Sequence, residues 1–270
     1  MTHSSKPDTA AADQGVLPGT VAAVYAAGGR LLDGFVTATE LLTVESIAAA
    51  IRAADTQSLS VLRPMLVQAR PGAGWVEDEL EGGVLPPGEW WVTDPVEGAI
   101  NYVHGLSEWA VTATLVRDNV PVLTAVHLPM TTTTYTAVAG RGAFQDTTPL
   151  RVSGKTQLGA ALVGTGQASP RDTAETFTAL GQSVTAMLNA AGVVTVSVPA
   201  TLQLIHVAAG RMDAFWQHSA VRSGLLAGAL LVQEAHGTIS DVHGQPWSLG
   251  SASFLAAAPG LHAASVTALS

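Results

Sequence analysis

The chain contains no cysteine, little charge and no long apolar run. The absence of cysteine excludes disulfides, thiolate metal sites and a cysteine nucleophile, and it fits a cytoplasmic protein. Charged residues make up 12% of the sequence, and its 12 Lys and Arg residues form no basic stripe, which argues against nucleic-acid binding. No run approaches the ~18 apolar residues of a membrane span, and Met1–Thr9 lacks the apolar core of a signal peptide.

Hydrophobic residues are abundant instead. They make up 47% of the 270 residues, so a large core can form. Residues 1–15 are predicted to be a disordered tail. The formal net charge is −9, so a small anionic substrate would depend on metal ions or helix ends for its counter-charge.

The hydrophobic periodicity predicts a mixture of helices and strands. Thr37 or Thr39 could cap the second helix, and Asp118-Asn119 indicates a hairpin turn between two β-like runs. After about residue 148 the pattern alternates between strand and helix. Such a mixture is typical of layered α+β or α/β folds. The expected helices span about 17–33, 40–55, 172–190, 201–209 and 224–236.

The segment from Trp90 to Gly105 combines the features of a binding site. An apolar run ends in two carboxylates, Asp94 and Glu97, and Gly98 precedes a short helix-like segment. Hard cations prefer carboxylate oxygens, and phosphate binds the free N–H groups at a helix start. An isolated Asp-Pro pair is more often an ordinary turn, so the longer context decides.

That context closely resembles the Asp-Pro-Ile/Val-Asp-Gly-Thr-x-Asn-Phe-x-His-Gly signature of the inositol monophosphatase family of magnesium-dependent phosphatases. The resemblance implies an α/β (α+β) fold, a layered αβαβα sandwich of the inositol monophosphatase and fructose-1,6-bisphosphatase type. It also implies an N-terminal half (16–147) carrying the metal-site motifs and a C-terminal half (148–270) that completes the site. Homodimers, Mg²⁺ and a small phosphorylated metabolite are the family's usual partners.

The same resemblance implies a set of metal ligands. Asp94, the backbone carbonyl of Val96 and Glu97 would bind Mg²⁺, with Glu97 replacing the family's second aspartate. Asp78 aligns with an upstream glutamate that binds metal, and Glu79 follows it in a catalytic role. Glu40 corresponds to an aspartate that faces the metal cluster. A shift of one residue would instead choose Glu77 or Glu79, and three adjacent acids can also be a solvated loop.

Two positions depart from the family's pattern. Ala99 replaces a threonine that aligns the attacking water, and Gly224 stands where the family has a metal-binding aspartate. The backbone N–H groups of Gly98 and Ala99 could still bind an anion. Three polar residues would contact the substrate, or would simply be polar loop residues: Gln217, His218 and Arg222.

Three functions remain open at this stage. The first is a Mg²⁺-dependent phosphomonoesterase acting on a small phosphate other than inositol phosphate. The second is a repurposed, non-hydrolytic enzyme of specialised metabolism with His218, Arg222 or Glu97 as acid–base groups. The third is a catalytically silent binding or scaffold protein, because fold alone does not determine function.

Overall fold

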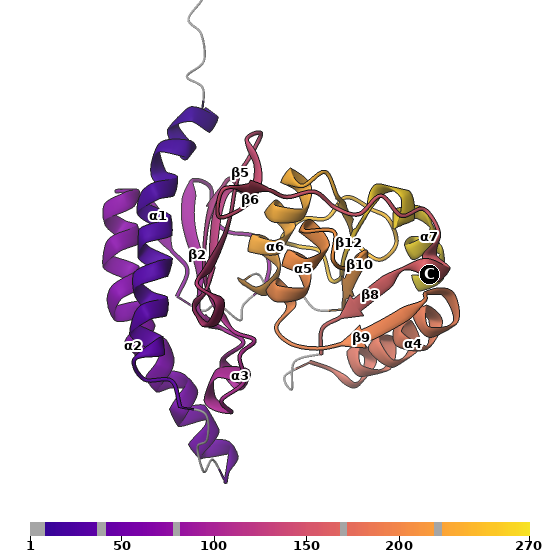
Figure 1. Ribbon diagram of the computed structural model, residues 1–270, viewed down its shortest axis with the longest axis horizontal. Helices are drawn as coiled ribbons and strands as arrows, with labels where there is room; N and C mark the ends of the chain where they lie inside the picture. The colour runs from indigo at the N-terminus through magenta and orange to yellow at the C-terminus, as the bar shows by residue number, and fades with distance from the viewer. Residues whose placement is uncertain (1–8, 37–41, 78–81, 168–171, 219–222) are drawn as a thin grey trace, which may run out of the picture.

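The structure is a computed structural model that describes residues 9–36, 42–77, 82–167, 172–218 and 223–270. The chain forms five layers that alternate between helices and sheets, as the resemblance implied (Figure 1). One helix pair covers the outer face of the larger sheet, a second pair lies between the sheets, and a third covers the smaller sheet. These pairs are α1 (Thr9–Leu32) with α2 (Val44–Ala69), α5 (Ala200–Ala208) with α6 (Ser223–Glu234), and α4 (Ala174–Ala190) with α7 (Pro259–Leu269).

The larger sheet contains seven strands in sequence order. Its neighbours pair antiparallel, except for β1 and β2, which pair in parallel. A short helix, α3 (Ala99–Val103), follows β2. The strands are β1 (Gly74–Trp75), β2 (Glu89–Glu97), β3 (Ala110–Arg117), β4 (Val120–Leu128), β5 (Thr133–Val138), β6 (Gly142–Gln145) and β7 (Thr148–Pro149).

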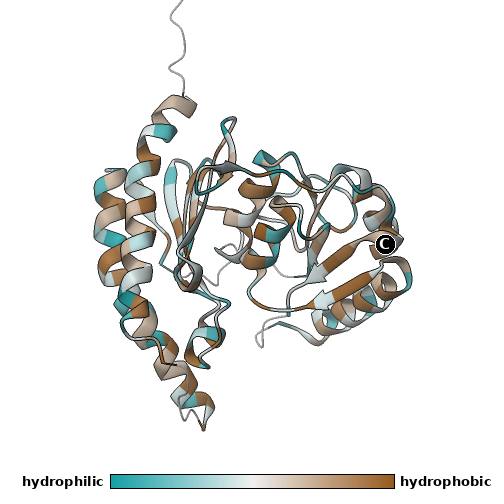
Figure 2. Ribbon diagram, in the orientation of Figure 1, coloured by the Kyte–Doolittle hydropathy of each residue, from teal (hydrophilic) through white to brown (hydrophobic). Residues whose placement is uncertain are grey.

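The smaller sheet has the order β11-β12-β10-β8-β9. Its two parallel pairs are β8 with β9 and β8 with β10, and Figure 2 shows β8 and β9 as strongly apolar. Strands up to residue 149 lie in the larger sheet and those from residue 162 in the smaller one, although the division into halves near residue 148 stays a prediction. The strands are β8 (Leu162–Thr165), β9 (Val193–Val196), β10 (Ala214–Gln217), β11 (Thr238–Ser240) and β12 (Phe254–Ala257).

The N-terminal helix begins earlier than the sequence suggested. Residues 9–15, expected in a disordered tail, form the first turns of α1. Asp13 is buried there and accepts two hydrogen bonds from the Arg117 guanidinium on β3. Val16 packs into the core nearby. This ion pair and the apolar contact anchor a segment whose polar composition resembled a tail.

The second helix is capped at a different residue from those expected. Thr43 is its N-cap, and its side-chain oxygen accepts a hydrogen bond from the Ser46 N–H. In return, the Ser46 hydroxyl oxygen accepts a hydrogen bond of 3.1 Å from the Thr43 N–H. Such reciprocal capping satisfies N–H groups that a helix start leaves free. Thr37 and Thr39 lie outside the described residues.

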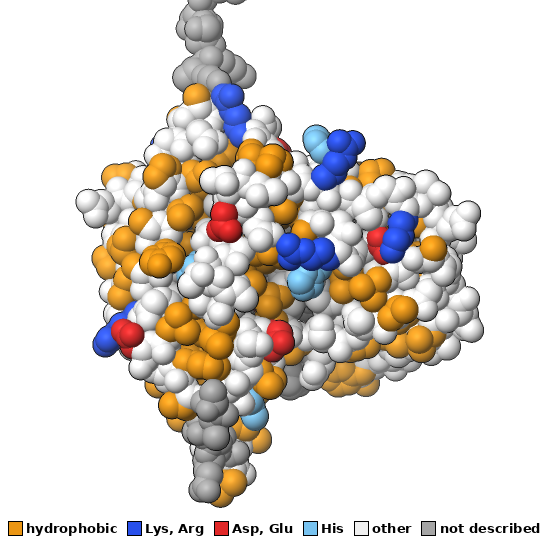
Figure 3. Space-filling model, in the orientation of Figure 1, with side chains coloured by type: hydrophobic (Ala, Val, Ile, Leu, Met, Phe, Trp, Pro, Cys, Tyr) orange, Lys and Arg blue, Asp and Glu red, His pale blue; other side chains and the backbone are white. Residues whose placement is uncertain are grey.

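The hairpin was placed correctly by its turn residues. Asp118 and Asn119 connect β3 to β4, and both have positive φ angles, 48° and 67°. Two consecutive residues of this kind match the twist of the adjoining strands. Apolar side chains fill the spaces between the layers. Within the described ranges, no helix is long and apolar enough to cross a membrane, and Figure 3 shows few charged side chains on the viewed face.

Candidate functional site

The two acids of the signature lie at a β-bulge near the end of β2. Asp94 pairs with Thr112 and Glu97 pairs with Ala110, so three steps along β2 face two along β3. In a regular strand, residues three apart point to opposite faces. The extra residue of the bulge places Asp94 and Glu97 on the same side of the sheet. That side faces the layer of α5 and α6, because Ala110 packs with their side chains.

The proline of the signature lies inside this bulge. The paired register skips Pro95 and Val96, and a proline has no N–H with which to continue the ladder. The Val96 N–H donates instead to the Asp94 carboxylate at 3.1 Å, and the Asp94 N–H donates to the Thr112 hydroxyl at 3.1 Å. The sequence Asp-Pro-Val-Glu therefore fixes both the bulge and the orientation of Asp94.

Glu97 is a buried carboxylate at the boundary between the two sheets and their helices. Only 3% of its surface is exposed. Its Oε1 accepts a long hydrogen bond of 3.4 Å from the Thr201 N–H at the start of α5. The N-terminus of a helix carries partial positive charge, which favours a carboxylate. The Glu97 side chain thus connects β2, in the first half of the chain, to the start of α5 in the second half.

Gly224 lies directly opposite this carboxylate. A Cβ built on Gly224 would be 3.9 Å from each Glu97 oxygen and 3.9 Å from the Ala200 Cβ. These are ordinary van der Waals distances, so a small side chain would fit there. The Thr201 hydroxyl donates to the Gly224 carbonyl at 3.1 Å and joins the starts of α5 and α6. The position that lacks the family's aspartate therefore faces the lengthened acid at position 97.

The rest of the signature has a structural role. Gly98 has a φ of 87°, and a Cβ there would lie 2.8 Å from the Glu108 carbonyl oxygen. Asn101 donates to the carbonyls of Glu108 and Val198 at 2.8 and 3.0 Å, so it connects α3 to the loop before α5. The Tyr102 hydroxyl donates to the Leu31 carbonyl on α1. Ala99 begins α3, which is only five residues long.

Gln217 ends β10 as a buried amide. It is 8% exposed, and its Oε1 has no hydrogen-bond partner among the described residues. A Cβ on Gly166 would lie 2.7 Å from that oxygen, so the glycine makes space for the amide. A buried acceptor without a donor is costly, and such a group often awaits a ligand or a water molecule.

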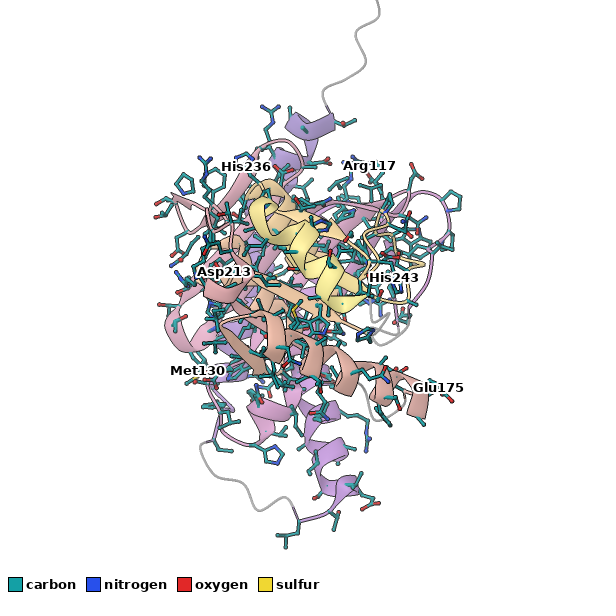
Figure 4. The ribbon with its side chains drawn as sticks, turned by 90° about the vertical axis from the view of Figure 1, so that its right-hand side faces the viewer. Arg117, Met130, Glu175, Asp213, His236 and His243 are labelled. Atoms are coloured by element: carbon teal, nitrogen blue, oxygen red, sulfur yellow. The ribbon has the colours of Figure 1, made fainter. Side chains whose placement is uncertain are left out.

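His218 follows Gln217 but lies in a separate cavity. This cavity of about 430 Å³ is lined by α4, α7 and the loops around Val242 and Ser253, and His243 contributes to it. Figure 4 shows this side, with His243 beside α7. Burial lowers the pKa of His218, and the nearby His243 lowers it further. Its Nε2 has no partner within the described part of the chain. Neither Asp94 nor Glu97 lines this cavity.

Of the candidate metal ligands that precede the signature, the structure describes only Glu77. Glu40, Asp78, Glu79 and Arg222 lie outside the described residues. Glu77, the alternative ligand from a one-residue shift, forms a bidentate pair with Arg63 on α2, with N–O distances of 2.6 and 3.0 Å. This pairing engages both of its oxygens, so a metal bound to Glu77 would compete with Arg63.

The donor chemistry at the bulge fits a hard cation. Two carboxylates and a nearby backbone carbonyl are the oxygen ligands that Mg²⁺ prefers. The bare Cα of Gly224 leaves space in front of Glu97. Over the described ranges, however, no three His, Asp or Glu side chains converge on one point. The described residues therefore fit Mg²⁺ by ligand type, and Asp94 and Glu97 would be two of its carboxylate ligands.

Comparison with known proteins identifies the family. The model of the inositol monophosphatase family matches residues 19–270. The chain belongs to the inositol monophosphatase family. An inositol-1-monophosphatase of Rhizobium meliloti (strain 1021) is 32% identical over 252 residues, which cover 86% of this chain and 88% of that protein. The Nus factor SuhB of Pseudomonas aeruginosa is 34% identical over 176 residues, covering 63% and 57%.

Solved structures of the family share the fold. An inositol monophosphatase from Anabaena (Nostoc) sp. PCC 7120 superposes with a TM-score of 0.79 at 24% identity, over 95% of each chain. Mycobacterium tuberculosis SuhB gives a TM-score of 0.75 at 25% identity, over 98% of this chain and 97% of that chain. These likenesses confirm the layered α+β fold. As a family member, the chain is a phosphatase-like protein for small phosphorylated molecules.

Three polar residues that hold the site together were not among the residues predicted from the sequence to form it. Thr201 binds Glu97 through its N–H and Gly224 through its hydroxyl group. The Gln203 amide donates to the Thr165 and Ser197 carbonyls at 3.0 and 2.6 Å and connects two strand ends. Asn101 was noted only as part of a motif. A buried amide on an otherwise apolar helix face was the available signal for Gln203.

Proposed function

We propose that this protein is a Mg²⁺-dependent phosphomonoesterase that acts on a small phosphate other than inositol phosphate through an altered metal site. The main support is the bulge, which directs Asp94 and the buried Glu97 toward the layer of α5 and α6. Two carboxylates at a protected boundary are suited to holding a cation beside a phosphate. Family membership supports the reaction class.

In this proposal Asp94, the Val96 carbonyl and Glu97 hold Mg²⁺, together with Asp78 and Glu40. When bound, Mg²⁺ would neutralise phosphate charge and lower the pKa of a coordinated water. Glu79 would assist Asp78 near the water. Because Asp94 receives the Val96 N–H, its carboxylate is held in one orientation before any cation binds.

The substrate would lie between the start of α3 and the end of β10. Gly98 and Ala99 would direct backbone N–H groups to the phosphate, and the free Oε1 of Gln217 would accept a hydrogen bond from a substrate hydroxyl. His218 and Arg222 complete the proposed set. His218 would act only if the substrate extends into the cavity that it lines. A cytoplasmic homodimer is part of the same proposal.

Two observations favour the alternative of a repurposed, non-hydrolytic enzyme. Ala99 offers no hydroxyl to a water, and Gly224 offers no carboxylate. Each such loss removes transition-state stabilisation, and every ~1.4 kcal/mol lost slows a reaction tenfold. The fold would persist without hydrolysis, because Asn101, Tyr102 and Gly98 have structural roles.

Phosphate release decides between these functions. The protein would be incubated with sugar, inositol and nucleotide monophosphates, in Mg²⁺ and in EDTA. We expect turnover of a non-inositol phosphate with Mg²⁺ only, and a loss of about 100-fold or more in kcat for Asp94→Asn. Asp33→Asn, which removes an exposed carboxylate at the end of α1, is the control and should retain full activity. No turnover across the panel would contradict the proposal and favour the non-hydrolytic or silent alternatives.

A further inference from the structure

One cavity in the second half of the chain is lined by two imidazoles. Its volume is about 430 Å³, and it lies between α4, the end of α7 and the turn that follows β11. His218 and His243 both line it, and Figure 4 views this side of the molecule. Neither Asp94 nor Glu97 contributes to its walls. The cavity is therefore separate from the acids of the signature.

Hydrogen bonds hold the walls of this cavity in place. The indole N–H of Trp216 on β10 donates to the Ser183 hydroxyl on α4 at 2.8 Å. The Val242 N–H, in the turn after β11, donates to the Ser253 hydroxyl at 3.2 Å. All four of these residues are buried. Each imidazole extends from backbone next to one of these bonds, so both rings are carried on fixed parts of the fold.

Small side chains on α4 leave the space in front of the imidazoles open. Ala179, Ser183 and Ala186 line the cavity. They are spaced by four and three residues, which places them on one face of the helix. None of the three side chains reaches far from the helix, so the cavity has room for water molecules beside a ligand.

The His218 imidazole has an unused ring nitrogen. Its Nε2 is buried and has no hydrogen-bond partner among the described residues. A buried polar atom without a partner is costly unless a ligand or a water molecule binds it. Burial and the nearby His243 lower the pKa of His218, so the ring is neutral near pH 7. A neutral imidazole nitrogen is the form that binds transition metals.

We propose that His218 and His243 form a binding site for a divalent transition metal such as Zn²⁺, separate from the proposed Mg²⁺ site. Imidazole suits Zn²⁺, whereas Mg²⁺ prefers oxygen ligands. Zn²⁺ usually takes four ligands. Over the described ranges no three His, Asp or Glu side chains converge, so water molecules complete its coordination. A bound cation joins the end of β10 to the turn after β11, and this inference does not depend on the proposed function.

Calorimetric titration with ZnCl₂, in the presence of excess MgCl₂, tests the site. His218→Gln and His243→Gln keep a polar side chain but remove the ring, and each should weaken Zn²⁺ binding roughly tenfold or more. His236→Asn is the control, because His236 is exposed and its φ of 68° is one that asparagine tolerates; it should bind Zn²⁺ like the unchanged protein. Unchanged binding in both Gln variants would overturn the proposal.

The Asp94→Asn variant shows which site the zinc occupies. It should bind Zn²⁺ as tightly as the unchanged protein, because Asp94 does not line the cavity. Loss of binding in Asp94→Asn would place the zinc at the acids of the signature and overturn the inference. Phosphate release, measured separately in MgCl₂, tests the proposed function. Its absence would leave the zinc site standing, because zinc binding is measured without substrate.

Co²⁺ in place of Zn²⁺ identifies the ligands by visible absorption, which responds to bound nitrogen. His243→Gln changes an exposed side chain, so this variant should fold normally and still lose the spectrum of the unchanged protein. Thermal melts give the matching result, because a cation that binds the folded state raises the melting temperature. ZnCl₂ should raise it in the unchanged protein and in His236→Asn but not in His243→Gln. A Co²⁺ spectrum that survives His243→Gln would overturn the two-histidine site.

Discussion

At the scale of single residues, this weakly charged chain buries several of its acidic side chains. Asp13 and Glu97 are almost fully buried, yet they differ in their partners. Asp13 pairs with Arg117, whereas Glu97 receives a backbone N–H at the start of α5. The first arrangement fastens α1 to the sheet. Glu97 has no cationic side chain paired with it among the described residues. A buried carboxylate of this kind marks a candidate ligand site.

Asp55 on α2 gives a pH-dependent prediction at the same scale. Burial raises its pKa from 3.8 to about 6. A raised folded-state pKa adds stability that is fully present below pH ~3.8 and is lost as the pH rises through ~6. Asp55→Asn should therefore raise the melting temperature at pH 7.5 by a few degrees, equivalent to roughly 1–3 kcal/mol, and change little at pH 4. Thermal melts across this range, with the exposed Asp33→Asn as control, check it; a pH-independent gain would contradict it.

At the scale of elements, the turn from β2 into α3 depends on a glycine. Gly98→Ala would force a Cβ into a positive-φ position and to within 2.8 Å of the Glu108 carbonyl. We expect a loss of about 2 kcal/mol in the free energy of unfolding, measured by urea denaturation. Gly29→Ala is the matched control, because Gly29 lies in α1 with open space around its Cα. That change should instead stabilise by up to ~1 kcal/mol. Equal effects would refute the argument.

The elements with strong local signals could be predicted from the sequence. The hairpin at Asp118-Asn119 and the helix over 224–236 were placed within one or two residues. The helix from Pro259 to Leu269 and the strand from Ala214 to Gln217 were not identified. The strand is four residues long and pairs with partners distant in sequence. Short strands are determined by such tertiary pairing more than by their own composition.

The candidate site was predictable only as far as the motif extends. The signature located Asp94, Val96 and Glu97, but residue counting could not show that Glu97 faces Gly224. That contact depends on the packing of α5 and α6 against the larger sheet. The same limit applies to His218, which directly follows Gln217 yet lies in another cavity. The ligand roles of these residues stay predictions.

At the scale of the whole molecule, Asn101 is a link between its two sheets. Its amide donates to carbonyls of Glu108 and Val198, which lie on opposite sides of the boundary. Asn101→Ala would leave both carbonyls without this donor, at a cost of about 1–3 kcal/mol. Scanning calorimetry should show a main transition several degrees lower. Asn189→Ala, which removes an exposed amide bound within α4, should cost no more than ~0.5 kcal/mol. Similar losses in both variants would contradict a linking role.

The bulge in β2 also has a consequence for how this chain tolerates change in length. A regular strand repeats every two residues, so removing or adding one residue turns every later side chain to the opposite face. Here the extra residue is absorbed between Asp94 and Glu97. A deletion of Pro95 would leave the two acids two apart, and a regular strand without the bulge places residues two apart on one face. The acidic pair should therefore stay on one face of the sheet when Pro95 and its bulge are lost together.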